Sequence, residues 1–88
     1  MATQNITGPQ VRKLRNKKGF SQEKLAARCN VYGWDLSRGT LSKIESGLRR
    51  VNDAELMILA IALKCELKDL YPDDRDLLLA AVRQGRSD

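Results

Sequence analysis

The segment from Ser37 to Gly47 constrains the fold more than any other part of the chain, because both of its ends carry helix-boundary residues. Ser37 suits an N-cap, since its hydroxyl can accept a hydrogen bond from a free amide of the first helical turn. Gly47 suits the position after a helix, since glycine takes a left-handed backbone without a Cβ clash. Leu41, Ile44 and Leu48 recur at helical spacing, which predicts a short helix with one side facing a core.

The opposite side of this predicted helix, residues 37–46, has short side chains apart from two long cations. Its members are Arg38, Gly39, Thr40, Ser42 and Lys43. A small, cationic helix surface fits the DNA major groove, where residues near the helix N-terminus reach base edges. Arg38 can hold guanine through two hydrogen bonds, and the Thr40 methyl group can contact thymine. We therefore interpret residues 37–46 as the recognition helix of a helix-turn-helix domain.

The charges are segregated along the chain. Residues 1–50 contain eleven Lys or Arg and three Asp or Glu, whereas residues 51–88 contain five and eight. A basic half joined to an acidic half is typical of a protein that binds a polyanion through one part of its surface. An evenly solvated charged surface is the alternative, and the segregation argues against it.

Composition excludes several classes of protein. The chain lacks histidine, and Cys29 and Cys65 match no metal-ligand spacing, so we expect two small buried thiols and no metal. The sequence contains no nucleophile-base pair or phosphate loop, which predicts a protein that is not an enzyme, has no catalytic residues and needs no cofactor. The absence of a membrane-spanning run and of a signal peptide predicts a cytoplasmic protein that does not contact a membrane.

Four further helices are expected around the recognition helix. The first starts at Gly8-Pro9 and stops at Gly19, and the second is capped by Ser21. A connection over residues 30–36 follows, longer than the usual turn of this motif, and Val31, Trp34 and Leu36 are expected to pack on the core. Asn52 and Glu55 form a capping-box pattern before a strongly apolar helix, and a short fifth helix ends at Pro72.

Several residues are placed to contact the DNA backbone. Gln22 lies in the first turn of the second helix, where the helix dipole favours a phosphate. Ser37, the N-cap of the recognition helix, is also expected to contact the backbone. Arg49 and Arg50 follow the recognition helix directly. We expect them to supply affinity and salt dependence and not base choice.

The domain organisation predicted is a loose arm over residues 1–7, a DNA-binding domain over 8–72 and a C-terminal helix or tail over 73–88. That tail carries the surplus leucines Leu77 and Leu78 with Val82. Apolar residues left over on an exposed helix indicate a partner surface, here a second copy of the chain. Packing back onto the same domain is an equally good interpretation.

The chain resembles the phage-repressor and Cro-like, or XRE-type, helix-turn-helix family over roughly residues 9–71. The resemblance is carried by Leu14-Arg15, residues 19–23, Leu25-Ala26, residues 37–47 and residues 59–63. It implies an all-α, compact bundle of five short helices, to which the C-terminal segment can add a sixth. It also implies an ion pair between Arg15 and Glu45 that fixes the angle of the recognition helix. The sequence departs from the family in its long turn, and in Gly39, which stands where many relatives carry a base-reading side chain.

These observations together predict a transcriptional regulator that binds double-stranded DNA sequence-specifically, as a repressor and a homodimer on an inverted repeat. The alternative is a protein-interaction module on the same fold, such as an antitoxin or adaptor that binds a protein partner through residues 77–82.

Overall fold

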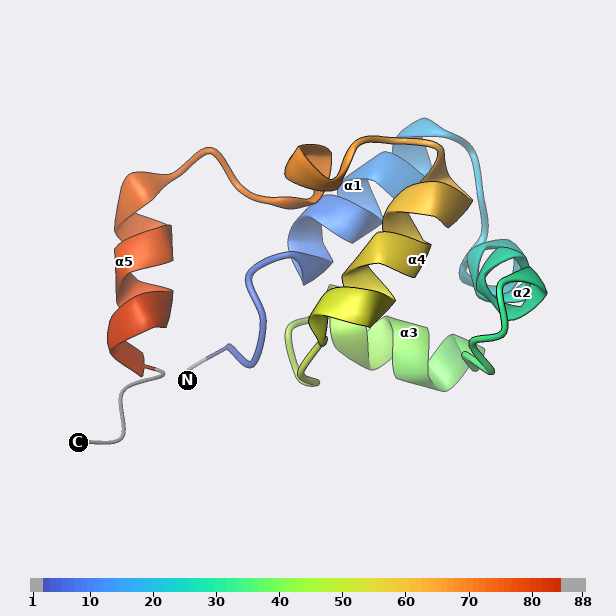
Figure 1. Cartoon of the computed structure of the whole chain (residues 1–88), viewed down its shortest axis with the longest axis horizontal. Coiled ribbons are helices and arrows are strands. Elements are labelled where there is room, and N and C mark those ends of the chain that lie inside the picture. The colour runs from blue at the N-terminus through green and yellow to red at the C-terminus, as the bar shows by residue number, and fades with distance from the viewer. Residues whose placement is uncertain (1–2, 85–88) are drawn as a thin grey trace.

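The computed structural model describes residues 3–84, and these form an all-helical chain. Its elements are α1 (Gly8–Lys17), α2 (Gln22–Val31), α3 (Arg38–Glu45), α4 (Asp53–Leu63), the 3-10 turn η1 (Leu67–Leu70) and α5 (Arg75–Gln84). The first four helices and η1 form a bundle, and α5 lies apart from it at the end of an extended connection (Figure 1). The all-α fold is thus confirmed, with the fifth helix of the bundle present as a single 3-10 turn.

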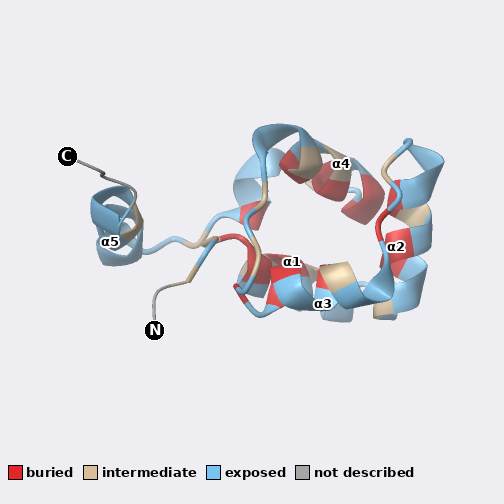
Figure 2. Cartoon of the chain, turned by 90° about the horizontal axis from the view of Figure 1, so that it is seen from below, coloured by how far each residue is buried: buried red, intermediate tan, exposed pale blue. Residues whose placement is uncertain are grey.

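The core lies where the inward sides of the bundle helices meet (Figure 2). Its fully enclosed side chains are Val11, Leu25, Cys29, Leu41, Ile44, Leu59, Leu63 and Leu70. The strongly apolar α4 contacts α1, α2 and η1, as its composition predicted. Each enclosed leucine contributes about 1.5–3 kcal/mol relative to an exposed one, so this core accounts for much of the stability of so short a chain.

The helix boundaries follow the capping residues identified in the sequence. The hydroxyls of Ser21 and Ser37 accept hydrogen bonds from the amides of Lys24 and Thr40, at 3.0 and 3.1 Å. At the start of α4 the capping box of Asn52 and Glu55 is complete. Three of the four bundle helices therefore begin at the N-cap residue that the sequence predicted.

The connection between α2 and α3 differs from the prediction. α2 continues two residues further than expected, because the side-chain amide of Asn30 donates to the carbonyls of Ala26, Trp34 and Leu36 and so joins the end of the helix to the turn. Val31, predicted to pack on the core, is instead 79% exposed on the last turn of α2. Leu36 is buried as expected.

Two further expectations are wrong. Leu48 is 65% exposed and does not extend the buried side of α3, because Gly47, at φ +77°, turns the chain out of the helical path. The N-terminal segment is also not a loose arm: residues 3–7 lie against the C-terminal end of α3 and are hydrogen-bonded to it.

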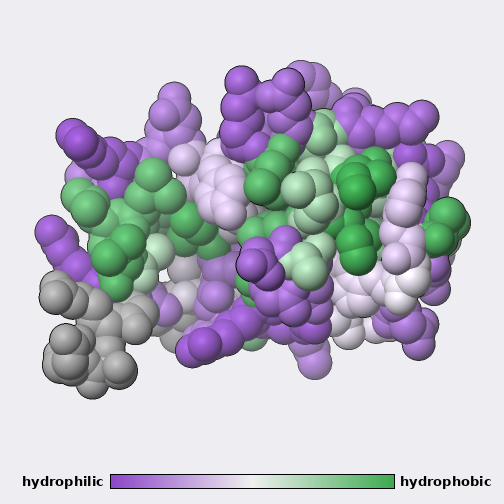
Figure 3. Space-filling view, in the orientation of Figure 1, coloured by the Kyte–Doolittle hydropathy of each residue, from purple (hydrophilic) through white to green (hydrophobic). Residues whose placement is uncertain are grey.

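The C-terminal helix α5 has no buried residue. Leu77, Leu78 and Val82 are all exposed, and only Ala81 is partly covered. Apolar surface gathers over this helix in the space-filling view (Figure 3). The interpretation in which α5 packs back onto its own core is therefore not what the structure shows, and residues 85–88 of the predicted tail lie outside the described part.

Candidate nucleic-acid interface

The recognition helix α3 presents the expected side to solvent. Its apolar residues Leu41 and Ile44 are fully buried, and the five residues expected to contact the major groove lie on the other side of the helix. Within that set, Arg38, Gly39, Ser42 and Lys43 are exposed and Thr40 is half-buried. α3 packs against α1 and α2 and lies along one edge of the bundle, where a groove can receive it (Figure 1).

A buried ion pair ties α3 to α1. The Nε and Nη2 atoms of Arg15 lie 2.7 and 3.1 Å from the two carboxylate oxygens of Glu45, and the side chains are only 11% and 2% exposed. Arg15 also donates to the carbonyl of Phe20 at 2.8 Å, in the connection to α2. The ion pair inferred from the family resemblance is therefore present. Such a pair gives a small net stabilisation, but leaving one partner unpaired costs about 3–5 kcal/mol.

Gln22 belongs to the same network. Its amide nitrogen donates to Glu45 at 3.0 Å, so one of the two amide hydrogens expected at a phosphate is already used. The second amide hydrogen of the Gln22 side chain remains available to a phosphate at the N-terminal turn of α2. A depression of about 180 Å³ lies beside this residue and is lined also by Arg12 and Ser42. Arg12 had not been assigned a role from the sequence, although its position three residues before Arg15 places it on the same side of α1.

Arg38, the proposed base reader, has an acidic neighbour. Its Nε atom lies 3.2 Å from a carboxylate oxygen of Glu23, and both side chains are largely exposed, at 65% and 75%. An exposed pair of this kind contributes little, because water and salt screen it. Glu23 therefore places a negative charge beside the surface proposed for DNA, which its position in the sequence did not indicate.

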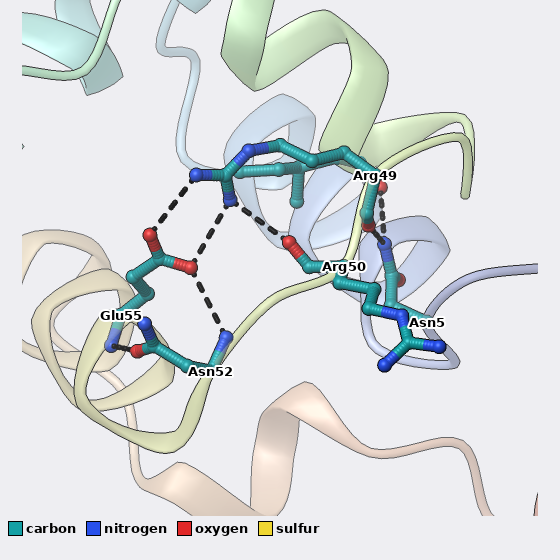
Figure 4. A network of polar contacts seen from close by, with 6 residues as sticks. Asn5, Arg49, Arg50, Asn52 and Glu55 are labelled. Carbon is teal, nitrogen blue, oxygen red and sulfur yellow. Dashed lines mark hydrogen bonds and ion pairs between the residues drawn. The ribbon is translucent and has the colours of Figure 1, made fainter. Parts of the chain in front are cut away.

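The two arginines after α3 have different surroundings (Figure 4). Both terminal nitrogens of Arg49 bind the carboxylate of Glu55 at 3.1 Å, and this hydrogen bonding lowers the pKa of Glu55 and raises that of Arg49. Arg50 is exposed; its carbonyl accepts from Arg49 at 2.9 Å, and its guanidinium donates to the amide oxygen of Gln4 at 3.3 Å. Arg50 is thus free to meet a phosphate, whereas Arg49 braces the loop that leads into α4.

Metal ligands, membrane spans and free thiols can be followed over residues 3–84. No group of three metal-ligating side chains comes together there, and none of the described helices is long and apolar enough to cross a membrane. Burial raises the pKa of the Cys29 thiol to about 11, so this cysteine is protonated and unreactive at neutral pH. Cys65 is also a free thiol and lies just after α4, partly covered.

Comparison with known proteins agrees with this geometry. Residues 11–70 match the model of a helix-turn-helix family, and the chain belongs to this XRE-type family of DNA-binding transcription regulators. One similar solved structure is the restriction-modification controller protein C.AhdI from Aeromonas hydrophila, at 35% identity and a TM-score of 0.66 over 74% of this chain and 87% of that one. Another is the hypothetical transcription factor NHTF from Neisseria, at 24% identity and a TM-score of 0.69 over 90% and 85% of the two chains. No curated protein matches the chain.

Proposed function

We propose that this protein is a sequence-specific regulator that represses transcription as a homodimer, with α3 of each copy in the major groove of an inverted repeat. The observation that carries the proposal is the outward side of α3, which combines small residues with Arg38 and Lys43 on a helix whose other side is sealed into the core. The likeness to a restriction-modification controller protein supports a role in transcription control.

Within this proposal the contacts divide into two kinds. Arg38, Thr40 and Lys43 read base edges, with Gly39 and Ser42 allowing the α3 backbone to come close. Gln22, Ser37 and the arginine loop after α3 hold the phosphates, and Arg50 has the most freedom to do so.

The dimer contact in this proposal is α5. Its apolar residues Leu77, Leu78 and Val82 are exposed, and a two-fold arrangement would let the same helix of a second copy cover them. A homodimer would also place two α3 helices for successive half-sites on one side of the duplex, which an inverted repeat requires.

The test is selection of bound duplexes from a random pool at moderate salt, followed by affinity measurements. An enriched inverted repeat is expected. Arg38→Ala should weaken binding to it and relax one base preference, whereas Arg50→Ala should weaken binding to all duplexes and lower the salt slope by about one. An unchanged preferred sequence and affinity in Arg38→Ala would mean that α3 is not the reading element.

A second candidate function rests on the same exposed α5. An antitoxin or adaptor would use this helix to hold a different protein, and it could bind DNA as well. Deleting residues 73–88 separates the two. Loss of dimerisation together with loss of DNA affinity favours the repressor, and loss of a co-purifying partner favours the adaptor.

A further inference from the structure

Residues 3–7, here called the N-terminal strap, run across the C-terminal end of α3 and bind it and the turn that follows through several hydrogen bonds. The backbone amide of Gln4 donates to the carbonyl of Gly47 at 2.8 Å. The Thr3 hydroxyl donates to the carbonyl of Asn5 at 2.6 Å and lies 3.3 Å from the same Gly47 oxygen. Gly47 lies just beyond the C-cap residue Ser46, so these donors join the strap to the turn that ends α3.

Asn5 is the centre of the strap because its side chain binds three parts of the chain at once. Its amide nitrogen donates to the carbonyl of Ile44, in the last turn of α3, at 3.1 Å and to the carbonyl of Arg49, in the following loop, at 2.7 Å. Its amide oxygen accepts from the backbone amide of Gly8, at the start of α1, at 2.6 Å. The contact between Asn5 and Arg49 is visible in Figure 4.

Two glycines show how closely α1 and the strap approach the C-terminal end of α3: Gly8 is the first residue of α1, and Gly47 lies under the strap. A Cβ atom on Gly8 would overlap the carbonyl oxygen of Ile44, and one on Gly47 would overlap the hydroxyl of Thr3. Neither overlap could be relieved by turning a long side chain. The start of α1 and the strap together therefore leave the end of α3 very little freedom to shift.

The strap and the Arg15–Glu45 pair hold the same end of α3 through different groups. Glu45 is bound through its side chain by α1, and the neighbouring residue Ile44 is bound through its carbonyl by Asn5. The strap also fixes the backbone of Arg49, and its Gln4 side chain contacts Arg50. It thus controls the recognition helix together with the loop that follows it.

We propose that the N-terminal strap is a positioning element for DNA reading, in which Asn5 sets the orientation of α3 and of the Arg49–Arg50 loop on the duplex. This inference rests on the proposed function. Asn5 does not lie on the outward side of α3, yet it is given a role in sequence discrimination. The reason is that a small rotation of the recognition helix moves every base-contacting atom at once.

The test compares Asn5→Ser with a control of similar stability. The serine hydroxyl can still accept from Gly8, but it is too short to reach the carbonyls of Ile44 and Arg49, and the net charge does not change. The control is Leu70→Val, which removes one methylene from a fully buried side chain on η1. Denaturation midpoints show whether the two variants are comparably destabilised. The readout is the affinity for the selected duplex divided by the affinity for a random one.

Asn5→Ser is expected to lower this ratio by about tenfold, which corresponds to about 1.4 kcal/mol, whereas Leu70→Val leaves it unchanged. An unchanged ratio in Asn5→Ser, with a wild-type protein that discriminates, overturns the inference and leaves the proposed function intact. A wild-type protein that does not discriminate overturns the proposed function, and the inference with it. If Asn5→Ser does not fold, Thr3→Ala is used with the same readout, because it removes one strap contact and keeps Asn5.

Discussion

Gly39 offers a direct test of how closely the α3 backbone meets DNA. It occupies the second position of the helix, it does not have a positive φ, and a Cβ atom there would meet nothing nearer than the Ser37 hydroxyl at 4.0 Å. The fold therefore has no steric need for glycine at this place. Glycine in a helix is less stable than alanine by up to about 1 kcal/mol, because the unfolded chain loses more conformational freedom.

Gly39→Ala should accordingly stabilise the free protein and weaken its DNA complex. Near a helix end the gain is about 0.5–1 kcal/mol, which raises the melting temperature by about 2–6 °C for a chain of this size. On DNA the added methyl group projects from the side of α3 that faces the groove. We expect affinity for the preferred duplex to fall by about tenfold, or about 1.4 kcal/mol.

Thermal denaturation and fluorescence anisotropy with a labelled duplex measure the two effects. The matched control is Lys64→Gly at the C-cap of α4, where Lys64 has the left-handed φ of 56° that glycine takes without strain. This variant should also be stabilised, by about 1 kcal/mol, and its lost charge should affect specific and random duplexes alike. If Gly39→Ala were stabilised and kept full affinity, the α3 backbone would not approach the duplex at Gly39, and the docking would need revision.

Three further substitutions test the surroundings of α3. Glu45→Ala should lower the free energy of unfolding by about 3–5 kcal/mol, and the double variant Arg15→Met, Glu45→Leu should recover most of it in denaturant titrations. The pKa of Glu55 is lower in the folded protein than its unfolded value of about 4.3, so its carboxylate stabilises the fold above that pH. This stabilisation is lost as the pH falls through the folded-state pKa. In Glu55→Gln, the free energy of unfolding should therefore fall less steeply with acid in a pH series. Glu23→Gln should raise affinity for every duplex, most at low salt, because it removes a negative charge beside the DNA surface.

The sequence predicted best those features that depend on neighbouring residues. The caps at Ser21, Ser37 and Asn52 each act on an amide three residues away, so both partners lie within one short segment of the printed chain. The buried side of α3 followed from the spacing of Leu41 and Ile44 in the same way. The Arg15–Glu45 pair spans thirty residues, and only the family resemblance indicated it.

The sequence predicted poorly those features that depend on long-range contacts of small polar residues. Nothing near Asn5 indicates that its amide reaches Ile44 and Arg49, because these partners are 39 and 44 residues away. The expectation for Arg49 came from its position after α3, and nothing in the neighbouring sequence indicated that its guanidinium binds Glu55 on α4. Asn30 extends α2 through contacts with a turn whose shape local preferences do not determine.

The polar side chains at the two ends of α3 have very different surroundings, and this has a consequence for recognition. At the C-terminal end, Glu45 and the carbonyl of Ile44 are fixed by α1 and by the strap. At the N-terminal end, Arg38 has only an exposed contact with Glu23. Because the C-terminal end of α3 is anchored, the helix backbone enters the groove in a defined orientation. This keeps the entropic cost of docking low. Free side chains at the other end can then adopt the rotamers that each base requires. We therefore expect substitutions at the anchored end to change discrimination across the whole half-site, and substitutions at Arg38 to change it at a single base pair.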